Sequence, residues 1–209
     1  IVHLAKPTVF TGYHSPCIIN NLQTNSKQKN IKHQKNPGGF PMCNSIRFFS
    51  PLGEILLTEK DCTLSGAYFV GQKHFPALQD IPGENTPSPI LTQAKAWLEE
   101  YFAGKNPPIP FPLAPEGTAF QKLVWEQLQK IPYEKTVSYG HLAKEIARQM
   151  GKSTMSAQAV GNAVGRNPIS VFIPCHRVLG ARGQLTGYAA GTDRKAALLR
   201  LECRCYNNV

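Results

Sequence analysis

The sequence predicts an α+β fold, with a small, mainly antiparallel sheet and one helix in its N-terminal half and a mainly helical C-terminal half. Short apolar runs separated by turn residues lie between residues 46 and 70, and apolar residues recur at helical spacing in 90–102 and 120–165. No stretch approaches the ~18 apolar residues that a membrane-spanning helix needs. With 209 residues, 42% of them hydrophobic, the chain can bury a core of its own.

The net charge of +10 is unevenly distributed along the chain. Residues 1–41 carry +5, residues 42–120 carry −3 and residues 121–209 carry +8, which sum to the total. A basic C-terminal half favours an anionic partner, with nucleic acid the first candidate. A basic surface that is merely solvated would give the same charge.

The six cysteines show no spacing typical of a disulfide framework or a zinc site. They stand at positions 17, 43, 62, 175, 203 and 205, with no CxxC pair. We therefore expect reduced thiols in an intracellular protein, in the cytoplasm of a prokaryote or the nucleus of a eukaryote.

Residues 1–41 have the composition of a disordered or non-native basic extension. The run from Asn20 to Pro37 is polar and rich in Asn, Lys and Gln, so it cannot bury enough surface to offset its ordering entropy. Met42 precedes the first strand-like run and is a candidate native start. A basic tail that helps to hold nucleic acid is the alternative.

Residues 42–115 are predicted to form an α/β scaffold domain that ends in a Pro-rich linker. Strands are expected at 46–50, 54–58 and 64–70, with a turn of more than two residues after the first. Ser88 and Pro89 open a helix that Gly104 can end. The five prolines of 107–115 indicate an extended linker and place the domain boundary there.

Residues 116–209 are predicted to be a mainly helical domain with a winged-helix-like helix-turn-helix. Thr118 and Gln121 form a capping-box pattern, a second helix is expected at 138–150, and Ser153 or Thr154 could cap a third that ends near Gly165. A tight glycine-containing turn between two short helices is typical of a DNA-binding motif, although an ordinary helical hairpin has the same pattern.

The third predicted helix carries alanine or glycine at every second position from 157 to 165. Small residues allow a close approach to another backbone, either of a neighbouring helix or of nucleic acid. Basic residues in the same region favour nucleic acid: Lys144, Arg148, Lys152 and Arg166.

The stretch from Asn167 to Val178 contains the strongest candidate for chemistry. The β-prone run Val171–Ile173 should be buried, and Pro174 then turns the chain to present Cys175 beside His176 and Arg177. A thiolate is the reactive form of cysteine, and neighbouring His and Arg favour it. An inert core cysteine is the competing interpretation.

Several ordered blocks resemble the O6-alkylguanine-DNA alkyltransferases (methylated-DNA–protein-cysteine methyltransferases). The block Ile-Pro-Cys-His-Arg-Val at 173–178 is similar to the active-site signature of that family, as are Asn-Pro-Ile-Ser at 167–170 and Val-Ser-Tyr-Gly at 137–140. Thr186–Gly191 and the helix from Arg194 to Glu202 resemble it too. In residues 42–115 the likeness is loose, limited to length and to the start Phe48–Gly53.

The resemblance implies direct repair of DNA without a metal or organic cofactor. A flipped-out guanine would meet Cys175, whose thiolate takes the alkyl group from O6 and keeps it, so each molecule acts once. It implies that His176 is the base acting through a water, that Glu202 orients His176, that Asn167 braces the turns and that Tyr139 crowds the target phosphate and donates towards the base. Arg177 is expected to form a structural ion pair.

The resemblance also implies which residues meet the substrate. Main-chain groups at Cys175 and Val178 would read the guanine, and residues 185–190 would form the pocket wall. Gln158 stands where many relatives have an arginine that replaces the flipped nucleotide, and Ala190 stands where glycine is common. The implied DNA and substrate contacts are Ser138, Ala157, Gln158, Gly161, Arg166, Val178, Tyr188 and Ala189.

Two other functions use the same residues differently. A DNA-lesion sensor would bind without transfer, but the presence of Cys175 with His176, Asn167 and Glu202 argues against it. A cysteine hydrolase would turn over repeatedly, but hydrolases usually bring Cys and His from separate segments. We therefore expect a repair enzyme that is monomeric in solution, whose partner is double-stranded DNA and which does not bind a membrane. Cooperative binding on DNA and O4-alkylthymine as a second substrate stay open.

Overall fold

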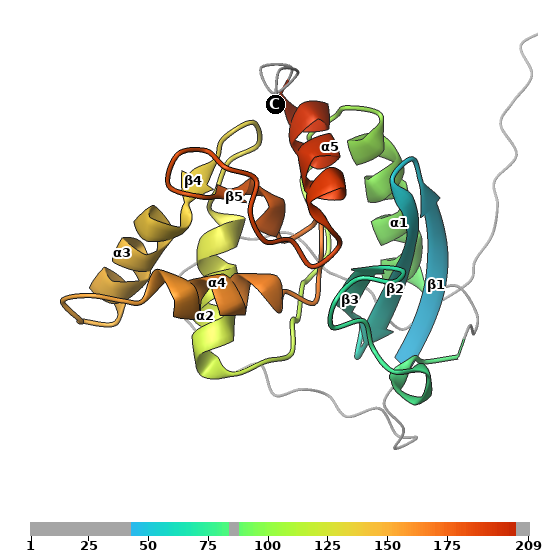
Figure 1. Ribbon diagram of the computed structural model, residues 1–209. Coiled ribbons are helices and arrows are strands. Elements are labelled where there is room, and N and C mark those ends of the chain that lie inside the picture. Colours follow the sequence, from blue (N-terminus) through green and yellow to red (C-terminus); the bar gives the residue numbers. More distant parts are fainter. Residues whose placement is uncertain (1–42, 84–87, 204–209) are drawn as a thin grey trace, which may run out of the picture. The chain divides into compact units, whose positions relative to one another are not determined.

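The structure, a computed structural model, describes residues 43–83 and 88–203. The predictions that residues 1–41 are an extension and that Met42 is the start lie outside the described residues. Along the chain, three strands and the helix α1 come first, followed by four helices and a short two-stranded pair (Figure 1). This order confirms the predicted α+β fold.

The sheet consists of β1 (Cys43–Ser50), β2 (Gly53–Lys60) and β3 (Thr63–Phe69), antiparallel in the order β1-β2-β3. The turn between β1 and β2 contains only two residues, because Ser50 pairs with Gly53. The prediction of a longer turn was therefore wrong. Gly53 has a φ of +114°, which glycine adopts without strain, and Ser50 Oγ donates to Gly53 O over 2.6 Å, so the tight turn is stable.

Helix α1 (Pro89–Phe102) packs against the sheet, as Figure 1 shows. Ser88 caps it by accepting a hydrogen bond from the Leu91 amide, and Gly104 follows its end with a φ of +81°, as predicted. Its inward side chains join the core: Ile90, Leu91, Ala94, Trp97, Leu98 and Tyr101.

The Pro-rich segment after α1 is extended but held along its length. The Trp97 indole donates to Pro107 O over 2.9 Å, and Leu113 forms a bridge with Leu64 of β3. Ala67 of β3 forms another bridge, with Ile169. The sheet therefore contacts both the Pro-rich segment and the segment that leads to Cys175.

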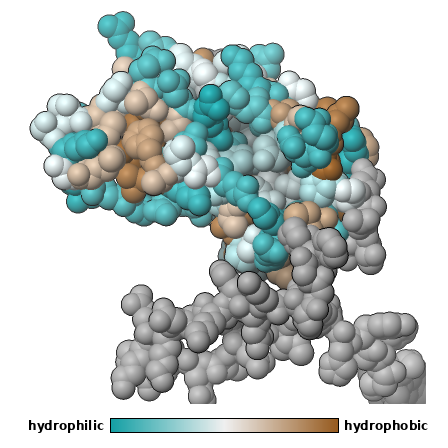
Figure 2. All heavy atoms as spheres, turned by 90° about the horizontal axis from the view of Figure 1, so that it is seen from below, coloured by the Kyte–Doolittle hydropathy of each residue, from teal (hydrophilic) through white to brown (hydrophobic). Residues whose placement is uncertain are grey.

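The helical part contains α2 (Ala119–Gln129), α3 (Tyr139–Gln149), α4 (Ala157–Gly165) and α5 (Thr192–Glu202). Strands β4 (Val137–Ser138) and β5 (Val178–Leu179) pair in parallel between them. Thr118 and Gln121 form the predicted capping box of α2. In Figure 2, most of the visible surface is hydrophilic, with a hydrophobic patch on the side of α2 to α4.

Two local predictions in this part were wrong. The cap of α4 is Ser156, which accepts from the Ala159 amide, in place of Ser153 or Thr154. The connection from α3 is consequently longer than the tight turn that was expected. Residues 171–173 are buried but form turns instead of a strand, because Val171 has a φ of +73° and Phe172 N donates to Ser170 O two residues earlier.

Cys43, Cys62 and Cys175 are free thiols, whereas Cys203 is disulfide-bonded, so the expectation of reduced thiols was wrong for Cys203. Within the described ranges, no helix has the length and apolar character needed to cross a bilayer.

Candidate active site

A series of tight turns presents Cys175 inside the protein. Ile173 N donates to Ile169 O over 3.0 Å, and Cys175 N donates to Ile173 O over 2.8 Å across Pro174. Pro174, with φ −80° and ψ 61°, has the geometry of an inverse γ-turn. A 3₁₀ turn, η2 (Cys175–Arg177), follows immediately. The turns thus place three chemically active side chains in succession in the core.

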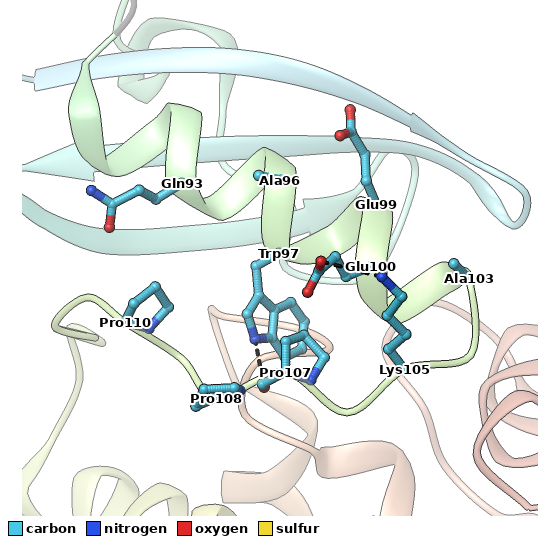
Figure 3. Close-up of a pocket in the computed structure, with 10 residues that line it drawn as sticks. All are labelled: Gln93, Ala96, Trp97, Glu99, Glu100, Ala103, Lys105, Pro107, Pro108 and Pro110. Atoms are coloured by element: carbon cyan, nitrogen blue, oxygen red, sulfur yellow. Dashed lines mark hydrogen bonds and ion pairs between the residues drawn. The ribbon is translucent and has the colours of Figure 1, made fainter.

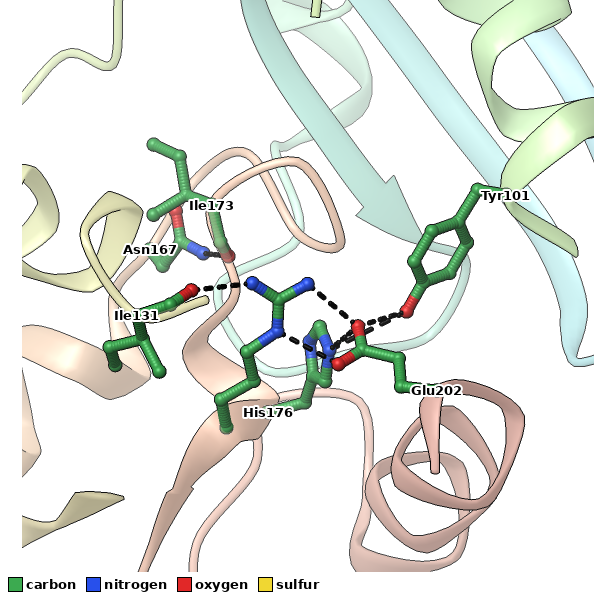
Figure 4. A network of polar contacts seen from close by, with 7 residues as sticks. Tyr101, Ile131, Asn167, Ile173, His176 and Glu202 are labelled. Carbon is green, nitrogen blue, oxygen red and sulfur yellow. Dashed lines mark hydrogen bonds and ion pairs between the residues drawn. The ribbon is translucent and has the colours of Figure 1, made fainter. Parts of the chain in front are cut away.

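Asn167 joins these turns to the sulfur. Its Oδ1 accepts from Ile169 N over 3.0 Å, while its Nδ2 donates to Ile173 O over 2.8 Å and to Cys175 Sγ over 3.1 Å. Figure 4 shows its amide pointing at the Ile173 carbonyl. Asn167 therefore has the bracing position that the resemblance implied, and it also contacts the thiol directly.

Glu202, at the end of α5, is the centre of a buried polar network (Figure 4). Its Oε1 lies 2.8 Å from His176 Nε2 and accepts from the Tyr101 hydroxyl over 2.7 Å. Because an ionised carboxylate only accepts hydrogen bonds, Nε2 carries the hydrogen and Nδ1 is the acceptor nitrogen. The structure thus brings Glu202 and His176 together as expected.

Arg177 forms the structural ion pair that was predicted. Its Nε and Nη2 donate to the two oxygens of Glu202 over 2.8 and 2.9 Å, and its Nη1 donates to Ile131 O over 2.7 Å. A bidentate pair of this kind holds a carboxylate in one orientation. Glu202 is therefore fixed before it orients His176.

The pKa values in this network follow from burial and pairing. Burial alone would raise the pKa of Glu202, but the hydrogen bonds and charges of His176 and Arg177 outweigh it and lower that pKa to about 2. Burial lowers the pKa of His176, against the opposing effect of Glu202. At neutral pH the network is therefore an ionised carboxylate, a neutral imidazole and a guanidinium.

Burial also raises the pKa of the Cys175 thiol, although the Asn167 hydrogen bond and the positive charge of Lys195 act in the opposite direction. The sulfur is therefore protonated at neutral pH and needs a base before it can attack. Nδ1 of His176 is buried and has no hydrogen-bond partner among the described residues. It is the free basic nitrogen of the cluster, on the residue next to Cys175.

Tyr139, Tyr188 and Lys195 lie within electrostatic range of the sulfur. Burial, followed by the charge of Cys175, raises the pKa of Tyr139 to about 12 and that of Tyr188 well above its ordinary value. The Tyr139 hydroxyl donates to Gly187 O over 3.1 Å. The segment expected to form the pocket wall is therefore tied to the start of α3, beside Cys175.

The residues expected to contact DNA or substrate fall into two groups, one exposed on or near α4 and one beside the pocket wall. Ala157, Gln158 and Arg166 are exposed on or next to α4, and Ser138 caps α3. Gly161 lies against Tyr139, whose ring would be 3.7 Å from an added Cβ. Val178 is buried in β5 and Ala189 is half-buried, so these two belong with the pocket and not with the α4 surface.

Sequence reasoning missed two residues of the site, Tyr101 and Lys195. The sequence position of Tyr101 gave no hint that its hydroxyl reaches Glu202 across the fold. Lys195 is completely buried, and its Nζ donates to Thr186 O over 2.7 Å. A signal was present for Lys195, since it shares the inward face of α5 with Leu198, Leu199 and Glu202.

A separate pocket of about 610 Å³ lies along the outer side of α1 and the Pro-rich segment (Figure 3). It is lined by Gln93, Trp97, Glu100, Lys105 and several prolines, and by none of the predicted site residues. Among residues 43–83 and 88–203, no three or more His, Cys, Asp or Glu side chains are placed to hold a metal ion. The candidate site is therefore the cluster around Cys175.

Comparisons with known proteins agree over both halves of the chain. Residues 48–115 match the ribonuclease-like domain, and residues 119–204 the DNA binding domain, of 6-O-methylguanine DNA methyltransferase. A methylated-DNA–protein-cysteine methyltransferase of Methanosarcina acetivorans is 44% identical, covering 76% of this chain and 97% of its own length. The constitutive enzyme of Bacillus subtilis is 36% identical over 73% of this chain and 91% of its own.

The solved structures agree with these sequence matches. The crystal structure of the Mycobacterium tuberculosis O6-methylguanine methyltransferase has a TM-score of 0.66 at 39% identity and covers 77% of this chain and 93% of its own. Its counterpart in complex with DNA has a TM-score of 0.64 at 38% identity, over 77% of this chain and 91% of its own. The chain with the buried Cys175 cluster thus belongs to the methylated-DNA–protein-cysteine methyltransferase family.

Proposed function

We propose that this protein repairs O6-alkylguanine in duplex DNA by transferring the alkyl group irreversibly to Cys175. The observation that carries the proposal is a buried thiol directly followed in the chain by a buried imidazole, whose Nε2 is held by Glu202 and whose Nδ1 has no hydrogen-bond partner among the described residues. A carboxylate, a histidine and a thiol in this relation follow the logic of a base and its orienting group.

The reaction balances without a cofactor. His176 takes the thiol proton through a bridging water, and its Nε2–H donates to Glu202, which stabilises the imidazolium that forms. The thiolate of Cys175 attacks the alkyl carbon as the bond from carbon to O6 breaks. The leaving guanine recovers the proton that the thiol gave up, so the products are a thioether and unmodified guanine.

The base must leave the duplex to reach the thiol of Cys175, a residue that is only 4% exposed. The exposed α4 residues Ala157 and Gln158 are proposed to enter the groove, where Gln158 fills the gap left by the flipped nucleotide. Ser138 and Arg166 are proposed to contact the phosphates, with the +8 charge of residues 121–209 supplying affinity that is independent of sequence. A repair protein of this kind acts where the DNA is, inside the cell.

The test is intact-mass analysis of the full chain after mixing with duplex DNA that carries O6-methylguanine. We expect one methyl group per protein, located on Cys175 by peptide mapping, with no further gain at excess DNA. Binding without a mass change would favour the lesion sensor. Continued production of repaired DNA beyond one equivalent would favour a hydrolase, and a methyl group on another residue would refute the assignment of Cys175.

A further inference from the structure

The wall segment, residues 185–190, is held partly by a group in the loop after β3 and by a side chain of α5. Lys73, in the loop after β3, donates its amide hydrogen to Ala189 O over 2.9 Å. Arg194 of α5 donates from Nη1 to Ala190 O over 3.1 Å. Lys73 and Arg194 thus fix two consecutive carbonyls of the wall, and Lys195 holds Thr186 O of the same segment.

Arg194 also contacts the sheet itself. Its Nε donates to Leu52 O in the β1–β2 turn over 2.9 Å, and its guanidinium lies 5.0 Å from the centre of the Phe69 ring. Gly53 leaves room for it, since a Cβ there would come within 3.0 Å of Nη2. One half-buried side chain therefore connects the hairpin turn, the end of β3 and the pocket wall.

We infer that Arg194 is a positioning residue that sets the width of the alkyl pocket, so that the N-terminal sheet takes part in substrate selection. The inference rests on the proposed function. Tyr188 and Ala190 are 9% and 8% exposed and belong with Cys175 to one buried cluster, so a shift of their backbone changes the packing around Cys175. A rigid pocket wall rejects a larger alkyl group. In a hydrophobic pocket, a difference of one methylene between two substrates changes the ratio of their rates by about 10–200-fold, and the wall can control selection on this order.

The experiment compares the rates of transfer to Cys175 from two duplexes that differ only in the lesion, O6-methylguanine or O6-benzylguanine. In Arg194→Met, the ratio of the benzyl rate to the methyl rate should rise about tenfold, because the wall can yield to the larger group. Arg194→Lys keeps the charge but cannot bridge Leu52 and Ala190 with a planar fork, so the ratio should rise by a smaller factor. If Arg194→Met does not fold, the rate ratio of Arg194→Lys tests the inference instead.

Lys122→Met is the matched control, since it removes a positive charge from an exposed site on α2. Its ratio should equal that of the wild type. Amide hydrogen exchange at Lys73 provides a local readout, because this amide is protected by Ala189 O and should exchange faster in Arg194→Met. A merely destabilising substitution would raise exchange throughout the sheet without changing the rate ratio.

An unchanged ratio in folded Arg194 variants, or a parallel fall of both rates, would overturn the inference while leaving the proposed function intact. If the wild-type protein formed no adduct with either duplex, the proposed function would fail and the inference with it. The two failures are therefore distinguished by the wild-type rates alone.

Discussion

In the cluster around Glu202 each charged group is held by several partners, whereas the exposed side of α4 presents small or uncharged side chains. Glu202 accepts four hydrogen bonds, from Tyr101, His176 and two nitrogens of Arg177. On α4, Ala157, Gln158 and Gly161 leave the backbone close to the surface. The difference indicates that the Glu202 cluster holds its side chains in a fixed geometry, whereas the α4 surface lets DNA approach closely. Substitutions in the cluster should therefore reduce transfer or stability, and substitutions on α4 should change DNA binding.

The largest effect is expected at the sulfur. Cys175→Ser should abolish alkyl transfer, because a buried serine hydroxyl is a far weaker nucleophile toward a saturated carbon, while the fold and DNA binding persist. Cys43→Ser is the control, since it changes another free thiol. Intact-mass analysis measures alkyl transfer to the protein. If Cys175→Ser still accepted the alkyl group, the cluster around Glu202 and Cys175 would not be the site of the chemistry.

Glu202→Gln should reduce both the transfer rate and the stability. Loss of the charge that stabilises an imidazolium at His176 should slow transfer by about 10²–10⁴-fold, as removal of general-base assistance does. Since Arg177 is left without its buried partner, the free energy of unfolding should fall by roughly 3 kcal/mol. Single-turnover kinetics and denaturant unfolding measure the two effects. Glu145→Gln is the control, since Glu145 forms an exposed ion pair on α3. It should leave the transfer rate and the free energy of unfolding nearly unchanged.

The pH dependence of stability provides a check on Glu202 itself. Its folded pKa is lowered from 4.5 to about 2, so its contribution is fully present above pH 4.5 and is lost as the pH falls towards 2. The difference in unfolding free energy between wild type and Glu202→Gln should therefore shrink over this range. A difference that stays constant from pH 6 to pH 2 would show that the carboxylate is not paired in the folded state.

Asn167→Ala is expected to have an intermediate effect. It removes the donor to Ile173 O and Cys175 Sγ and leaves Ile169 N without its acceptor, at a cost of about 1–3 kcal/mol for the buried polar groups. The pKa of the Cys175 thiol should rise further, because the Asn167 hydrogen bond lowers it. Thermal unfolding and the pH dependence of thiol alkylation test this, with the exposed Asn106→Ala as control. An unchanged thiol pKa would contradict the contact.

The smallest effect is expected on α4. Gln158→Arg adds a positive charge where the groove is approached, so DNA should bind more tightly, with a dependence on salt that is steeper by about one counterion. Transfer should become several-fold faster if extrusion of the base limits it. Gln93→Arg adds the same charge on α1 and is the control. If both variants strengthened binding equally, the effect would reflect net charge and not the position of Gln158.

The same two regions show what the sequence could predict. The caps at Ser88 and Thr118 were recognised because a cap is local, with its hydrogen bond spanning three residues. The contact between Glu202 and Tyr101 could not be predicted from local sequence patterns, because the two residues are 101 positions apart in the chain. The turn at Val171 was missed because its composition favours a strand. The hydrogen bonds from Asn167 Nδ2 to Ile173 O and from Ile173 N to Ile169 O override that preference.

The most direct test of the central claim, that His176 activates Cys175, is the pH profile of single-turnover transfer in wild type and His176→Gln. The wild-type rate should be high at pH 7 and fall only in acid, because burial lowers the pKa of His176 below 6.5. In His176→Gln the rate at pH 7 should drop about 10²–10⁴-fold and climb with pH towards and beyond 9, where the thiol with its raised pKa ionises unaided. Profiles that coincide in shape would contradict the claim.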